Sequence, residues 1–215
     1  MYRGENRSEN ELDRLLMVMV AGVIVGARLG HCLFYDPVWY LKHPMEILRI
    51  WEGGLASHGA AVGILASLYG FSRKTGRPSW IWLLDHIVIP VSLAGCFIRL
   101  GNFFNSELVG IPTDVSWAVV FEQVDGIPRH AVQLYEAGAY GMIFVLLILL
   151  YRRTGAQTRQ GMFFSLFLIT VFTSRFLLEF FKTPQAAYEA GFTLTVGQWL
   201  SIPFVFLGLI VFSRK

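Results

Sequence analysis

The chain has 215 residues, of which 54% are hydrophobic and 15% charged, and its formal net charge is +3. Soluble domains usually carry about 25% charged residues, so this composition excludes an ordinary soluble globule. The Lys and Arg residues lie in short loops between apolar runs, where basic charge sets membrane orientation. We therefore expect no nucleic-acid partner.

Apolar runs close to the about 20 residues that cross a bilayer recur six times. After a polar head at residues 1–14, we expect spans at about 15–35, 54–71, 80–100, 132–151, 161–181 and 193–212. Residues 45–51 are expected to form a short interfacial helix, Pro90 predicts a kink in the third span, and residues 115–122 are expected to pair as a strand. The pattern predicts an all-α, polytopic membrane bundle with a small outer loop region and a single domain, residues 1–215.

The loops between these spans differ in charge. Basic residues gather at 72–79, at 152–160 and at the C-terminus, and six spans would place all three on one side together with the N-terminal head. The positive-inside rule makes that side the cytoplasm. The loops at 36–53, 101–129 and 182–192 then face outward.

Polar residues inside the spans fall at one depth. Only Asp85 and His86 lie near the inner end of a span, whereas every span contributes a polar group near its outer end: Arg28, His58, Arg99, Asn102, Gln133, Tyr135, Glu136, Arg175, Glu179 and Gln198. Snorkelling residues would occupy both ends. Convergence at one depth predicts a site near the outer leaflet.

The residue types in this layer indicate anion chemistry. Arg99 and Arg175 keep their charge at any depth and suit a phosphodiester, and Glu136 and Glu179 are placed to pair with them. Arg99 shares a helix face with Asn102, and Asn105 and Glu107 follow within the same exit from the membrane. The structural alternatives are a snorkelling Arg99 beside capping asparagines and an Arg175–Glu179 ion pair without a catalytic role.

His58 is the only histidine that the sequence places in this layer, and imidazole is the natural general base near neutral pH. Gly59 opens a nearly side-chain-free run that admits a lipid chain or a second helix. The alternative is a hydrogen-bonded structural histidine. The histidines lie on separate segments without ligand spacing, and no glycine-rich nucleotide loop is present, so the sequence predicts no metal and no cofactor.

Six segments resemble, in order, the bacterial prolipoprotein diacylglyceryl transferase family. They are GARLG at 26–30, GGLASHGAAVG at 53–63, RLGNFFNSELVG at 99–110, RHAVQLYE at 129–136, RFLLEFF at 175–181 and GQWLSIP at 197–203. The resemblance implies an enzyme that moves the diacylglyceryl group of the membrane lipid phosphatidylglycerol to the lipobox cysteine thiol of a prolipoprotein signal peptide. Glycerol phosphate is the expected leaving product.

The same resemblance implies roles for individual residues. Arg99 and Arg175 would hold the lipid phosphate, Glu179 would support them, and His58 would activate the thiol. The substrate-binding positions are expected at Arg28, Gly59, Arg99, Asn102, Asn105, Glu107, Gly110, Gln133, Tyr135 and Glu136.

Three departures from the family accompany the match. The family has one more span before the first one expected here, its outward loop after Gly110 is longer, and an arginine often stands in the place of Lys182. Two other functions stay open on the residues alone. An anion transporter or channel would need polar groups through the full thickness of the membrane, and an inactive lipid-binding homologue would keep the motifs without turnover.

Overall fold

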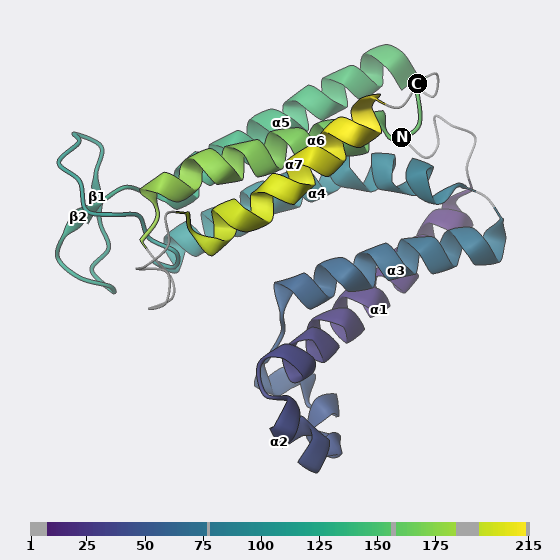
Figure 1. The fold of residues 1–215 in the computed structure, drawn as a ribbon, viewed down its shortest axis with the longest axis horizontal. Helices are drawn as coiled ribbons and strands as arrows, with labels where there is room; N and C mark the ends of the chain where they lie inside the picture. The colour runs from purple at the N-terminus through teal and green to yellow at the C-terminus, as the bar shows by residue number, and fades with distance from the viewer. Residues whose placement is uncertain (1–7, 77, 156–157, 184–193, 214–215) are drawn as a thin grey trace. The chain divides into compact units, whose positions relative to one another are not determined.

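The computed structural model describes residues 8–76, 78–155, 158–183 and 194–213 (Figure 1). Nearly all regular structure in these ranges is helical, so the expected all-α class is confirmed. The chain divides into two compact units, Met1–Leu83 and Leu84–Lys215. Each unit has its own packing.

The first unit is built on a close pair of helices, α1 (Glu9–Phe34) and α3 (Ser57–Thr75). Ser8 caps α1 by accepting a hydrogen bond from the Glu11 backbone N–H at 3.2 Å, and acidic residues in the first turn suit the positive end of the helix. The pair meets through glycines. A Cβ on Gly59 would collide with the Gly26 carbonyl, so small residues let the two backbones touch.

The loop between these helices is held by one buried arginine. It contains α2 (Pro37–Lys42) and two 3₁₀ turns, η2 (Pro44–Leu48) and η3 (Ile50–Glu52), in place of the single helix expected at 45–51. The guanidinium of Arg28 donates to the carbonyls of Glu46, Ile47, Gly53 and Gly54. A buried guanidinium needs several acceptors, and the loop backbone supplies them.

The second unit is a bundle of α4 (Trp80–Phe104, which begins in the first unit), α5 (Val132–Thr154), α6 (Met162–Leu178) and α7 (Val196–Ser213). Its core consists of apolar side chains from the first three of these helices: Val88, Ile89, Tyr140, Ile143, Leu147 and Phe163. The α6 and α7 helices lie side by side (Figure 1). Pro90 lies inside α4, where the sequence predicts a kink.

Asp85 is a polar residue that lies away from the outer layer, and its hydrogen bonds show its role. Its carboxylate accepts hydrogen bonds from the backbone N–H groups of Gly161 at 2.5 Å and Phe164 at 2.8 Å. These are donors of the first turn of α6, which otherwise have no intrahelical partner. Asp85 therefore caps a neighbouring helix.

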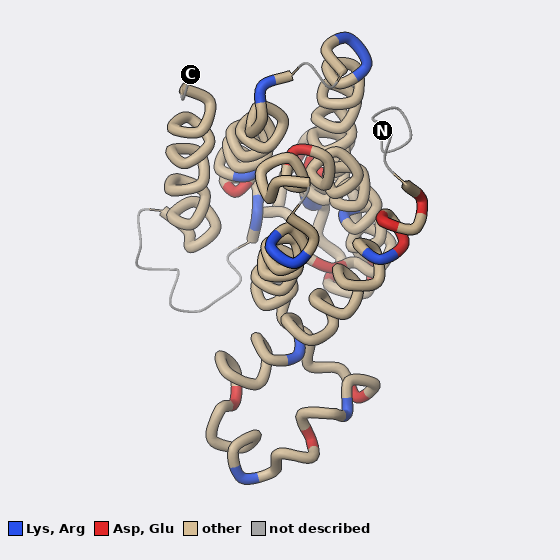
Figure 2. The backbone as a smooth tube through the Cα atoms, turned by 90° about the vertical axis from the view of Figure 1, so that its right-hand side faces the viewer, with Lys and Arg blue, Asp and Glu red and all other residues tan. Residues whose placement is uncertain are grey.

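Five of the described helices are long and apolar enough to cross a membrane: α1, α4, α5, α6 with its 3₁₀ extension, and α7. Charged residues are sparse along these helices (Figure 2). The α3 helix, which matches the second expected span, is not among the five; it is rich in small residues and ends with Arg73 and Lys74. The count of six spans therefore stays a prediction.

Backbone hydrogen bonds hold together the outward loop of the second unit. Within the expected strand region only β1 (Val119–Val120) forms, and it pairs antiparallel with β2 (Pro128–Arg129). The segment at Gly110 lies between the segments at His130 and Lys182. Gly110 N donates to His130 O at 3.1 Å, and Gly110 forms a backbone bridge with Lys182. The loop thereby reaches the end of α6.

Candidate functional site

An ion pair joins α4 to α5 at the outer end of the second unit. Arg99 Nε lies 3.1 Å from Glu136 Oε2, and the side chains are 13% and 1% exposed. The same guanidinium donates from Nη1 to Asn102 Oδ1 at 3.3 Å, as the shared helix face predicts. The site is therefore built around a carboxylate that is buried beside a cation.

Lys182 adds a second cation to the same carboxylate. Its Nζ lies 2.8 Å from Glu136 Oε1 and 3.2 Å from Glu179 Oε2, and the lysine side chain is 6% exposed. The backbone bridge between Lys182 and Gly110 aims this side chain at α5. From the sequence, Lys182 stands out only as a departure from the family, since no residue near it in the chain indicates that Glu136 is its partner.

Glu107 is held in a strained turn just after α4. Ser106 and Leu108, on either side of it, have φ values of 56° and 55°, which non-glycine residues seldom adopt. The turn lets the Glu107 carboxylate accept from Asn102 at 2.6 Å while its backbone carbonyl accepts from Gln133 Nε2 at 2.6 Å. Asn105 is exposed and makes no side-chain hydrogen bond with the described residues.

Gln133 keeps one polar atom unused. It is fully buried, and its Oε1 has no donor among the residues that the structure describes. Buried polar atoms are rarely left unpaired, so this oxygen is an acceptor open to an incoming donor.

Arg175 is the cation without a carboxylate. It is partly buried in the last turn of α6 and makes no hydrogen bond or ion pair with any residue in the described ranges. The buried Tyr140 hydroxyl lies within electrostatic reach of Arg175, Arg99 and Glu136, so the two guanidinium groups share one neighbourhood.

The Arg175–Glu179 pair that helical spacing suggests does not form. Helix α6 ends at Leu178, and η5 (Glu179–Phe181) continues as a 3₁₀ turn. In that tighter turn residues three apart are eclipsed, so Glu179 pairs with Lys182 instead. Gln198, also expected in the layer, caps α7 by accepting from the Thr195 N–H at 3.0 Å.

The His130 imidazole lies at this end of the second unit. The Tyr135 hydroxyl accepts from Trp117 Nε1 at 2.9 Å and lies 3.2 Å from His130 Nδ1. His130 also packs edge-on against Phe181. From the sequence, His58 is the only histidine expected in this layer, because His130 precedes α5 in a loop whose fold no local pattern predicts.

The remaining expected residues have contacts of other kinds. His58 is exposed in the first turn of α3, and Gly59 packs on α1, both in the first unit. Arg28 is committed to the loop carbonyls described above. Gly110 lies against His130, where a Cβ would meet the His130 carbonyl and approach Val132 Cγ2 within 2.7 Å.

This arrangement favours an anion at the outer end of the bundle. Three cations (Arg99, Arg175, Lys182) face three carboxylates (Glu107, Glu136, Glu179), but the pairing leaves Arg175 without a partner. The Arg99 guanidinium contacts Glu136, Asn102 and the Tyr140 hydroxyl. A guanidinium without a carboxylate partner suits phosphate. The fold and site define a helical membrane protein with a buried cluster of charged side chains.

Comparison with known proteins gives the family. Residues 1–214 match the family model described as prolipoprotein diacylglyceryl transferase. A phosphatidylglycerol–prolipoprotein diacylglyceryl transferase of Tolumonas auensis is 54% identical over 98% of this chain and 81% of the relative, and one of Chloroherpeton thalassium is 50% identical over 100% and 80%. One of Bacteroides fragilis is 43% identical over 97% and 79%.

The chain belongs to the prolipoprotein diacylglyceryl transferase family. It is therefore a membrane transferase of lipoprotein biosynthesis, as the six ordered segments predict.

Proposed function

We propose that this chain moves the diacylglyceryl group of phosphatidylglycerol to the thiol of the lipobox cysteine in a prolipoprotein. The names of its relatives state the lipid and the protein substrate. The observation that assigns residues to this reaction is the pair of cations near Tyr140, Arg99 and Arg175. Arg99 pairs with Glu136, whereas Arg175 has no carboxylate partner in the described ranges. A phosphodiester supplies the missing anion.

In the proposed reaction the cysteine sulfur attacks the carbon of the diacylglyceryl group that is esterified to the phosphate. A C–S bond forms, the C–O bond breaks, and glycerol phosphate leaves with the electron pair of that bond. Arg99 and Arg175 bind the phosphate and stabilise the charge that grows on the leaving oxygen. Glu136, held between Arg99 and Lys182, keeps the Arg99 guanidinium in place.

The thiol must lose its proton for this attack. An unperturbed cysteine has a pKa of about 8.5, so only a few per cent is thiolate at neutral pH. We assign His58 as the base on the family resemblance of its segment, because imidazole is the natural general base near neutral pH. The proton then passes to solvent or to the released glycerol phosphate.

The proposed location is the bacterial inner membrane, with the site on its periplasmic side. Within the second unit, Gln133 and Glu136 lie at one end of α5 and Arg152 and Arg153 at the other. The positive-inside rule makes the Arg152 end cytoplasmic, which supports a periplasmic position for the charged cluster.

The test is a transfer assay on the purified full chain in detergent. A lipobox peptide and phosphatidylglycerol are added, and the peptide mass is followed together with free glycerol phosphate. The expected result is a peptide that gains one diacylglyceryl group for each glycerol phosphate released. A peptide with serine in place of its cysteine is the control, and absence of both products with the cysteine peptide would overturn the proposal.

A further inference from the structure

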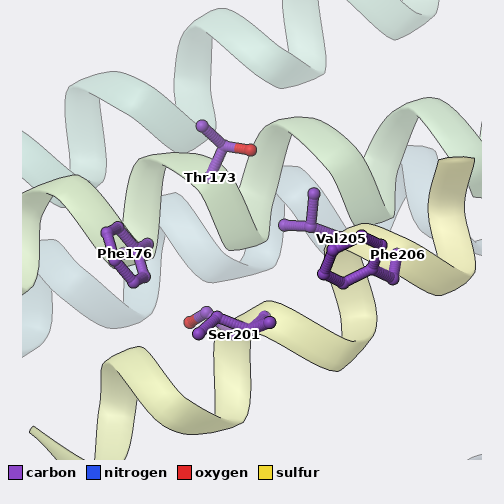
Figure 3. Close-up of a pocket in the computed structure, with 6 residues that line it drawn as sticks. Thr173, Phe176, Ser201, Val205 and Phe206 are labelled. Carbon is purple, nitrogen blue, oxygen red and sulfur yellow. The ribbon is translucent and has the colours of Figure 1, made fainter. Parts of the chain in front are cut away.

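A groove lies between α6 and α7 at the surface of the second unit. Its volume is about 220 Å³. Figure 3 shows side chains from both helices around it. The lining residues are Thr173, Phe176, Ser201, Ile202, Val205 and Phe206.

The groove is open at its side and is bounded at two levels along the helices, where glycines bring α6 and α7 together. At the outer end a Cβ on Gly197 would lie 2.5 Å from a carboxylate oxygen of Glu179. At the inner end a Cβ on Gly208 would lie 2.8 Å from the Cγ1 of Ile169. Pro203 lies in α7 between these contacts, where a missing N–H and a ring clash bend a helix.

The lining of the groove suits a hydrocarbon ligand. The Ser201 hydroxyl is fully buried and is already satisfied, since it donates to the Gly197 carbonyl at 2.7 Å. Phe176, Val205 and Phe206 present carbon atoms to the space (Figure 3). An apolar lining of this kind takes an apolar group.

The groove begins where the charged cluster ends. Phe176 follows Arg175 directly in the chain, and the Glu179 carboxylate that touches Gly197 also pairs with Lys182. Along the axis of α6, Arg175 therefore lies within one helical turn of the outer part of the groove, which an acyl chain would enter from its open side. The direction from Gly197 to Gly208 leads down the bundle, as an acyl chain runs from its headgroup.

We propose that this groove holds the upper part of one acyl chain of the donor phospholipid and so positions the glycerol carbon for attack. This subsite rests on the proposed transfer reaction. Lipid tails are as apolar as the groove, so the hydrophobic effect contributes little, and specificity comes from close packing. The groove therefore acts on chain length and shape more than on overall affinity.

The experiment compares a variant that fills the groove with one that leaves it open. Val205→Trp fills it, and Ile210→Trp places the same ring on an exposed position of α7 outside the lining. Transfer is measured with phosphatidylglycerols of short and long acyl chains. We expect Val205→Trp to raise KM roughly three- to tenfold for the long-chain lipid and much less for the short-chain lipid.

A smaller side chain at position 205 provides a second test that does not depend on the folding of Val205→Trp. Val205→Ala widens the groove, and we expect it to improve the use of a lipid with a methyl-branched acyl chain relative to a straight one. Ile210→Trp and Ile210→Ala should keep the wild-type ratio between lipids. Identical chain-length and branching profiles for the Val205 and Ile210 variants would overturn the subsite.

A measurement without turnover separates this inference from the proposed reaction. Phosphatidylglycerol with a photoreactive group in the upper acyl chain should label the segment 201–206 of the wild-type chain, and Val205→Trp should lose that label. Labelling only of exposed positions such as Ile210 would contradict the groove even in an active enzyme. Labelling of 201–206 without transfer to peptide would instead contradict the proposed reaction.

Discussion

Lys182 Nζ lies 2.8 Å from Glu136 Oε1, and both side chains are almost completely buried. Glu136 belongs to α5, whereas Lys182 follows the 3₁₀ turn after α6. Both Glu136 oxygens depend on ionic contacts, because neither has a hydrogen bond with good geometry in the described ranges. The carboxylate that steadies Arg99 is therefore itself steadied by a residue from a distant loop.

Lys182→Met should destabilise the protein and abolish transfer. Removing one partner of a buried ion pair leaves an uncompensated charge and costs about 3–5 kcal/mol. Lys182→Arg should keep most of the stability, since it keeps the charge. Thermal unfolding in detergent checks this, with Lys74→Met as an exposed control, and an unchanged melting temperature for Lys182→Met would show that the pair contributes nothing.

Arg99 and Arg175 should respond differently to the same substitution. Arg175→Ala should reduce transfer by roughly ten- to hundredfold through loss of a charge-assisted contact to phosphate, with little change in stability, because Arg175 has no ion pair among the described residues. Arg99→Ala should lose both transfer and stability, because it uncouples Glu136. Rates and melting temperatures of both variants decide this, and normal transfer by Arg175→Ala would remove Arg175 from the phosphate site.

Gly110→Ala should destabilise the outward loop by about 1–3 kcal/mol, since the added methyl group meets the His130 backbone and Val132. Gly126→Ala is the matched control in the same loop, because nothing lies within 4 Å of its Cβ position. Trp117, which bonds to Tyr135, gives a fluorescence signal of this region. Equal unfolding midpoints for the two variants would contradict the packing role of Gly110.

The outward loop should loosen in acid. Hydrogen bonds from Arg129 hold the pKa of Asp125 below its usual value of 3.8, so the folded loop favours the charged carboxylate. Its contribution to stability is present above that usual value and is lost as pH falls through the lowered pKa. Asp125→Asn should remove this part of the acid transition seen by Trp117 fluorescence. A transition of unchanged size would assign it to other groups.

The assignment of the base to His58 predicts a pH signature. His58→Gln should slow transfer at about pH 7 and recover substantially near pH 9, where the free thiol ionises without help. His130→Gln serves as the comparison. Its imidazole is engaged with Tyr135 and Phe181, so its loss should lower loop stability and leave a deficit at every pH. The reverse pattern would move the base from His58 to His130.

Several site features were predictable from local spacing. Arg99 and Asn102 are three residues apart on α4 and do form a hydrogen bond. The same logic failed for Arg175 and Glu179, because Glu179 begins the 3₁₀ turn after α6 and its carboxylate pairs with Lys182 at the end of that turn. Helical spacing predicts side-chain partners only while the helix continues, and the end of α6 is set by the loop hydrogen bonds of Val109 and Ile111 with residues 181–183.

The sequence by itself determined the helices and their apolar character, because backbone groups in hydrocarbon must be satisfied within the segment and long apolar runs can do this only as helices. It also determined the family, through motifs that keep their order along the chain. Only the tertiary structure decided which charges meet. Glu136 lies between Arg99 of α4 and Lys182 beyond α6, and the α6–α7 groove exists because glycines fix two helices at both ends. Such contacts join residues that are distant in sequence, and they depend on how whole helices pack.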